Sequence, residues 1–218
     1  WDVAGLYIRA DSDITRSGYL QYDRLQQGYA GTGPYGYYRV GANAGLNNPA
    51  MKGWLSPDLA YSVVSENTIF DAKASRDIMK LDGGQMGIAI GYQFQKEEVN
   101  NPGTPGPATG NIVGLGYSAA TGSRDINAVF AELYAPVLKN LEITAAIRYD
   151  DYSDAGGTWN PKIGAKWTVI PSLVLRGTWA SAFRAPGLYE SGNSASAGFV
   201  TASDPVRCPI TGLAADCN

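Results

Sequence analysis

The chain has 218 residues, a formal net charge of −3 and 17% charged residues, and 44% of its residues are hydrophobic. This hydrophobic content argues against disorder over most of the chain, and the mild acidity argues against a general nucleic-acid-binding protein, which would carry a basic field. Because the chain has no histidine, a His-based catalytic triad and a His metal site are excluded.

Neither end of the chain resembles the end of a domain. No basic region and apolar run follow Trp1, so no signal peptide is predicted. The apolar runs are far shorter than the ~20 residues that a transmembrane helix needs. The first residues are typical of the middle of a strand, and Asp216-Cys217-Asn218 is typical of the middle of a loop. We therefore expect a piece of a longer protein.

Alternation of apolar and polar residues with a period of two predicts about seven strands. The clearest case begins at Leu141, where Leu141, Ile143 and Ala145 alternate with Glu142, Thr144 and Ala146. In chain order, the predicted strands cover about 1–13, 66–79, 85–95, 124–135, 141–150, 159–169 and 173–180. Most exceed the ~5–6 residues of an ordinary strand, and several match the ~9–11 residues of a tilted strand that crosses a bilayer.

The predicted connections differ between the two ends of the strands. Tight turns are expected at 82–84, 136–140 and 170–172. The alternate connections, at about 14–58, 99–123 and 183–218, are long and rich in Gly, Pro, Asn and Ser, and one near 154–158 is short. Short turns on one rim and long loops on the other are typical of an outer-membrane β-barrel. A soluble β-sandwich would show the same alternation and stays open as an alternative.

The two faces of the predicted strands have different chemistry. Aromatic residues lie mostly toward the ends of the apolar faces, as in interfacial girdles; they are Tyr92, Phe94, Tyr149, Trp159, Trp167 and Trp179. The opposite faces carry charged residues, which are candidates for facing a water-filled lumen; they are Glu142, Arg148, Lys162, Lys166 and Arg176. In a soluble sandwich these charges would face solvent.

Two consecutive segments carry a family resemblance. They are Asn160-Pro-Lys-Ile-Gly-Ala-Lys-Trp167 and the stretch from Ser172 to Glu190, which contains Phe183-Arg184-Ala185-Pro186 and Leu188. This pattern resembles the barrel of TonB-dependent outer-membrane receptors, most specifically over about 124–190. The resemblance implies an all-β fold for this chain, with about seven long strands and long extracellular loops. It further implies that these strands form an antiparallel segment of a transmembrane β-barrel of 22 strands.

The resemblance also implies a function in transport, with no enzymatic step and no cofactor. Such receptors bind and import a scarce nutrient with energy from the TonB system. The first expectation is a ferric siderophore, and the others are cobalamin, a saccharide or another metal complex. The implied partners are lipid of the outer membrane of a Gram-negative bacterium, a plug domain, the remaining barrel and the TonB complex, with no nucleic acid. We find no plug domain or TonB box in residues 1–218 and expect a partial barrel. The alternatives are a passive porin-like barrel and a soluble β-sandwich carbohydrate-binding module.

Some loop residues are further candidates. Pro186 has no N–H and ends sheet pairing, and Ala185 before it is held extended. Arg184 is a candidate for contacting an anionic ligand, although the motif also fits a plain strand terminator. Tyr35, Tyr37 and Tyr38 lie in a glycine-rich loop and are candidates for stacking on a ligand, or they pack within the loop.

Two other loop clusters admit a structural or a binding interpretation. Asp150, Asp151 and Asp154 suit either a Ca²⁺ site or solvated turn carboxylates, but they lack the spacing of a Ca²⁺-binding loop. Cys208 and Cys217 are the only cysteines. They predict a disulfide if the compartment is oxidising, and the family resemblance, which puts this loop outside the cell, favours that pairing.

Overall fold

The computed structural model describes residues 1–190 and 194–198 and contains two compact units. The first unit comprises Trp1–Ser12, Val63–Asn101 and Ala120–Ser194, and it holds most of a β-sheet. The second includes Asp13–Ser62 and Pro102–Ala119, and it holds the helices together with some strand ends. Within the described residues, none of the helices combines the length and the hydropathy needed to cross a bilayer.

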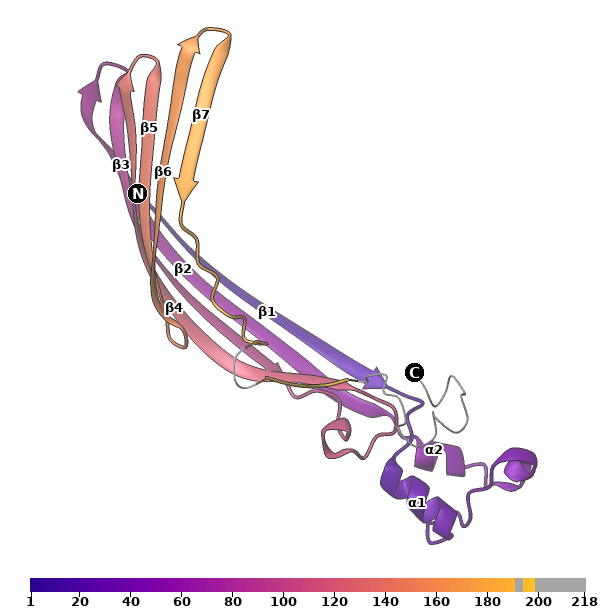
Figure 1. Ribbon diagram of the computed structural model, residues 1–218. Helices are drawn as coiled ribbons and strands as arrows, with labels where there is room; N and C mark the ends of the chain where they lie inside the picture. Colours follow the sequence, from indigo (N-terminus) through magenta and orange to yellow (C-terminus); the bar gives the residue numbers. More distant parts are fainter. Residues whose placement is uncertain (191–193, 199–218) are drawn as a thin grey trace. The chain divides into compact units, whose positions relative to one another are not determined.

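The sheet contains seven long strands that follow one another in chain order (Figure 1). Neighbouring strands from β2 to β7 pair antiparallel, and a short β8 (Ser194–Ala197) pairs with β4. The prediction of an all-β antiparallel sheet is therefore confirmed. The seven strands are β1 (Asp2–Arg16), β2 (Leu59–Leu81), β3 (Gly84–Asn101), β4 (Tyr117–Leu138), β5 (Leu141–Tyr152), β6 (Gly156–Ile170) and β7 (Leu173–Ala180).

Two strands begin about seven residues earlier than their sequences predict. β2 begins at Leu59 instead of about 66, and β4 begins at Tyr117 instead of about 124. The predicted long connection at 99–123 was therefore wrong at both ends, because the chain between β3 and β4 covers only 102–116. Most of the extra residues of β4 are small and they show no clear alternation, but residues 120–123 pair with residues 98–101 of β3. Hydrogen bonds to an existing neighbouring strand extend β4 where side-chain patterning gives no signal.

The three tight turns are at the predicted places and lie at the same end of the sheet (Figure 1). They connect β2 to β3, β4 to β5 and β6 to β7, and the pairing register shifts shortly before each turn. Such bulges are common at the rims of barrels. Gly83 has no room for a side chain, because a Cβ there would lie 2.2 Å from the carbonyl oxygen of Leu138. The absence of a side chain thus allows adjacent hairpins to pack closely.

The register divides the sheet into an apolar and a polar face. Leu141, Ala145 and Tyr149 of β5 pair with Trp167, Ile163 and Trp159 of β6. The alternate positions of β5 pair with polar or small residues, for example Glu142 with Lys166. The apolar face continues onto β3 and β4, where Ile88, Ile90 and Tyr92 pair with Leu133, Ala131 and Val129. The alternation seen in each strand therefore adds up to two continuous faces.

The second unit gives structure to the predicted long loops. The connection after β1 contains α1 (Tyr22–Ala30), the 3-10 helix η1 (Gly41–Leu46) and α2 (Met51–Leu55), and the one after β3 contains η2 (Pro107–Thr109). Sequence patterning did not predict these helices, which are short; α1, η1 and α2 also contain glycine. Met51 and Leu55 of α2 are almost completely buried, so this unit has a small core of its own.

Candidate functional site

The five predicted lumen-facing residues share the polar face. Glu142 pairs with Lys166, and Lys166 pairs with Arg176 on the next strand. Arg148 and Lys162 fall on the same face, because they occupy alternate positions of the same two strands. The Nζ of Lys166 donates to Oε1 of Glu142 at 2.7 Å. The structure thus brings all five onto one face, and that this face lines a lumen stays a prediction.

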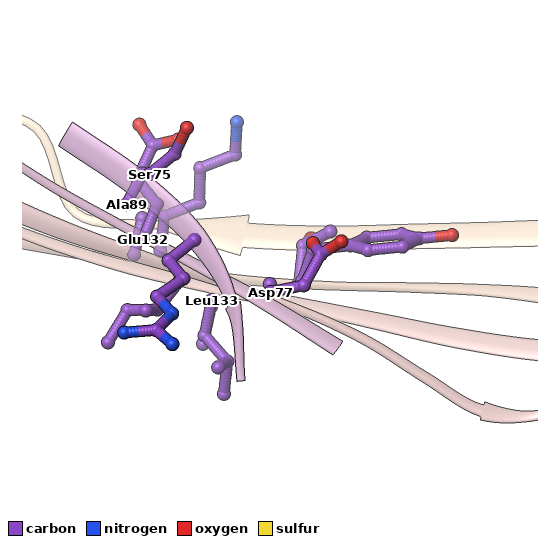
Figure 2. A pocket seen from close by; sticks show the side chains of 13 residues that line it. Ser75, Asp77, Ala89, Glu132 and Leu133 are labelled. Carbon is purple, nitrogen blue, oxygen red and sulfur yellow. The ribbon is translucent and has the colours of Figure 1, made fainter. Parts of the chain in front are cut away.

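The polar face contains the largest of the described hollows (Figure 2), with a volume of about 680 Å³. Ser75 and Asp77 of β2, Glu132 of β4 and Lys162 of β6 line it. The hollow therefore spans five neighbouring strands on the charged side of the sheet, where a wet interior is expected. Its lining on this face comprises Ser75, Asp77, Gly87, Ala89, Glu132, Tyr134, Thr144, Ala146 and Lys162.

An ionic network lies farther along the same face. Arg148 donates from Nε to Oδ1 of Asp150 and from Nη2 to Oε1 of Gln93, each at 2.7 Å. Asn160 donates to the other carboxylate oxygen of Asp150 at 3.2 Å. Asp150 is 6% exposed, so its charge is desolvated and needs these donors. Because Asp150 and Asp154 have different arginine partners, the geometry favours structural carboxylates over the Ca²⁺ interpretation.

The apolar face carries the predicted aromatic residues. Tyr149 and Trp159 pair across two strands with ring centroids 4.7 Å apart, and Trp159 is 60% exposed. Toward the other end of β3 the same face becomes charged, with the pair Lys96–Glu98. Arg9 of β1 contacts Glu66 of β2 at 2.5 Å in the same region. The exposed apolar surface is therefore bounded by charge, as expected where a lipid-facing wall enters water.

The segment after β7 crosses the polar face. The ring centroid of Phe183 lies 6.0 Å from that of Tyr152, which the register places on the polar side. Phe183 is thus separate from the aromatics of the apolar face. The side chain of Leu188 approaches Gly122 of β4, 3.8 Å from the position of an added Cβ. Phe183, Arg184, Ala185, Pro186 and Leu188 therefore belong to one segment that lies over the polar face.

Arg184 is paired within that segment. Its Nη2 donates to both carboxylate oxygens of Glu190, at 2.9 and 2.8 Å, and the backbone N–H of Gly187 donates to Oε2 at 2.7 Å. The hydrogen bonds from Arg184 and Gly187 hold the pKa of the Glu190 carboxyl below its usual value, and Glu190 in turn raises the pKa of Arg184. Contact of Arg184 with an anionic ligand stays a prediction.

Comparison with known proteins gives the decisive observation. Residues 2–209 match the family described as TonB dependent receptor-like, beta-barrel. The chain belongs to this family. Its members are transport receptors and not enzymes, as the sequence predicted.

Two curated relatives are bacterial proteins that are named as receptors. The chain is 26% identical over 199 residues to "Ferric enterobactin receptor PirA" of Pseudomonas aeruginosa, which covers 88% of the chain and 23% of the relative. It is 25% identical over 101 residues to "Probable TonB-dependent siderophore receptor PirA" of Acinetobacter baumannii, covering 44% and 13%. A solved ferric enterobactin receptor (PfeA) in complex with BCV-L6 aligns with a TM-score of 0.49 and 16% identity, covering 87% of the chain and 24% of that structure. The chain spans about a quarter of the length of these relatives or less.

The candidate tyrosines of this TonB-dependent receptor chain pack on different neighbours. The ring of Tyr35 is 6.1 Å from that of Trp54, and that of Tyr38 is 5.7 Å from that of Tyr29. Tyr37 lies against Gly31 and is 58% exposed. Packing within the loop accounts for Tyr35 and Tyr38, whereas Tyr37 presents most of its surface to solvent. Contact of these rings with a ligand stays a prediction.

Sequence reasoning missed one residue and made one prediction that the structure does not describe. Arg124 has a side chain that is only 4% exposed, and it bonds to Asp154 and to the carbonyl of Pro186. It lies at the predicted strand boundary among small polar residues, so neither period nor motif marked it. The proposed disulfide between Cys208 and Cys217 lies outside the described residues.

Proposed function

We propose that the full-length protein is an outer-membrane receptor of a Gram-negative bacterium that imports a ferric siderophore with energy from the TonB system. This chain would form part of the wall of its barrel. The observation that carries the proposal is the two-faced sheet, apolar on one side and charged on the other, in a chain matched to the receptor family over residues 2–209. A wall between lipid and a wet lumen requires such a division.

The dimensions of the apolar face support a place in a bilayer. Leu141 and Tyr149, the first and last residues of the apolar series in β5, are eight residues apart. At ~3.4 Å per residue and a tilt of about 40°, these residues are separated by roughly 20 Å along the membrane normal. Their side chains extend this to about the ~25 Å height of the apolar band of outer-membrane barrels. The wall would therefore match the hydrocarbon layer.

The names of the relatives support the ligand class. The Pseudomonas aeruginosa relative is named a ferric enterobactin receptor, and the Acinetobacter relative is named a probable siderophore receptor. We propose ferric enterobactin as the first ligand to test. Cobalamin, a saccharide and other metal complexes are the alternatives. The plug domain, the TonB box and the remaining strands would lie in parts of the protein outside residues 1–218.

Uptake in cells tests this proposal. Deletion of the full gene is expected to abolish uptake of radioactive iron supplied as ferric enterobactin, and a strain that lacks TonB should show the same loss. Unchanged uptake in the deletion strain would reject this ligand. Uptake that needs the gene but not TonB would indicate the passive channel. Recovery of the full-length protein from the aqueous phase without detergent would reject the barrel.

A further inference from the structure

Arg124 has an unusual environment for a charged residue of a barrel wall. It lies on the polar face of β4, opposite Glu97 of β3, and its side chain is only 4% exposed. A guanidinium group out of water needs acceptors for its N–H groups, because an unpaired buried charge is strongly destabilising. The partners of Arg124 therefore show which segments depend on it.

The partners of Arg124 come from two segments far away in sequence. Its Nε and Nη2 donate to Oδ2 of Asp154, at 3.1 and 2.8 Å, in the short turn between β5 and β6. Its Nη2 also donates to the backbone carbonyl of Pro186. The guanidinium carbon lies 5.7 Å from the ring centroid of Tyr152, in cation–π range. Arg124 thus joins β4 to the β5–β6 turn and to the segment after β7.

We call residues 181–190 the strap. Figure 1 shows this chain leaving the end of β7 and running toward the far part of β4. Leu188 lies against Gly122 of β4, and Leu188 and Tyr189 line a hollow with Asn67 of β2 and Glu97 of β3. The strap therefore passes from the edge strand over β6 and β5 to the middle of the sheet. The strand β8 that follows pairs with β4.

Two other polar contacts of the strap lie within it or at its start. Pro186 cannot donate a hydrogen bond, and Ala185 before it is held extended. The Arg184–Glu190 pair is internal to the strap and exposed, with the Arg184 side chain 77% exposed. Ser181 bonds to Pro161, but only at the end of β7. The carbonyl of Pro186 gives the strap a polar link to β4 through Arg124.

We propose that Arg124 is the positioning residue that fixes the strap on the polar face. The function of the Phe-Arg-Ala-Pro motif then includes presenting the carbonyl of Pro186 to Arg124. The conspicuous arginine of the motif, Arg184, pairs with Glu190 on the exposed side of the strap. In the proposed receptor, the strap narrows the wet interior near the long-loop end of this wall.

Distance measurement in the full-length receptor tests the proposal without a ligand. Nitroxide labels at Tyr189→Cys on the strap and Val129→Cys on the apolar face of β4 would report the position of the strap by double electron–electron resonance. Cys208 and Cys217 are replaced by serine in every sample. We expect a single narrow distance. Arg124→Gln should enlarge the detached population roughly 10- to 100-fold, as expected for the loss of a charge-assisted hydrogen bond, and give a second, broad distance.

The matched control is Arg184→Gln, which makes the same change at the exposed arginine of the strap and should leave the distance narrow. A narrow distance in folded Arg124→Gln, or equal broadening in both variants, would overturn the proposal. If Arg124→Gln loses the heat-modifiable migration of a folded barrel, Arg124→Lys is measured in its place. Lysine keeps the positive charge but lacks the planar guanidinium group that bonds to two acceptors. The same broadening is then expected, and a narrow distance overturns the proposal. Failure of both variants to fold overturns it too, because Arg124 would then support the wall itself.

Discussion

A charge placed on the apolar face is the most direct perturbation of the proposed wall. Ile163 of β6 is 52% exposed and pairs with Ala145 of β5. Ala145 lies four residues from both Leu141 and Tyr149, so Ile163 is at the centre of the apolar band. At ~3.4 Å per residue and a tilt of about 40°, the nearest interface is roughly 10 Å away. The side chain of an arginine at position 163 would therefore sit near the bilayer midplane.

The expected cost follows from that depth. Arginine at the midplane of a barrel wall costs about 2–4 kcal/mol, which corresponds to roughly a 30- to 1,000-fold loss in the ratio of folded to unfolded receptor. The assay is denaturant unfolding of the full-length receptor in lipid vesicles, comparing wild type with Ile163→Arg. The matched control is Glu132→Arg, which places the same side chain in the hollow of the polar face. Equal or greater destabilisation by Glu132→Arg would refute the assignment of the two faces.

Three further predictions test separate parts of the structure. Gly83→Ala should lower the free energy of unfolding by about 1–3 kcal/mol in the same assay, because the added Cβ would clash with a backbone carbonyl. The control Gly177→Ala, with open space around the added Cβ, should be neutral, and similar losses of stability in both variants would contradict the prediction. Asn111→Ala removes the side-chain oxygen that accepts a hydrogen bond from a backbone N–H of α1. Hydrogen exchange of the amides in the first turn of α1 should accelerate by roughly fivefold, which corresponds to about 1 kcal/mol, and unchanged exchange would show that this hydrogen bond is dispensable. Because the pKa of Glu190 is lowered, its bond to the Gly187 N–H should be fully present above the usual pKa of a glutamate and be lost as pH falls through the lowered pKa. Nuclear magnetic resonance of ¹⁵N-glycine-labelled receptor should show a Gly187 transition below pH 4.5, and a midpoint above pH 4.5 would contradict the lowered pKa.

The sequence by itself determined that seven long strands follow one another, which faces they have and where the tight turns lie, but not the bounds of every strand. Period-two alternation is a local property, so the division between Glu142 and its apolar neighbours was readable without a partner strand. The turn at Asp82-Gly83 was readable for the same reason, because turn chemistry depends on adjacent residues. The Phe183-Arg184-Ala185-Pro186 motif then pointed to the receptor family, which the match over residues 2–209 shows.

Only the tertiary structure decided where strands are extended by their neighbours and which arginine is buried. Residues 120–123 are strand because β3 offers them hydrogen bonds, and their own side chains carry no signal for it. Arg124 is important because Asp154 and Pro186, 30 and 62 residues away, converge on it. Contacts at such separations depend on how the whole sheet folds, and no local pattern in one sequence records them.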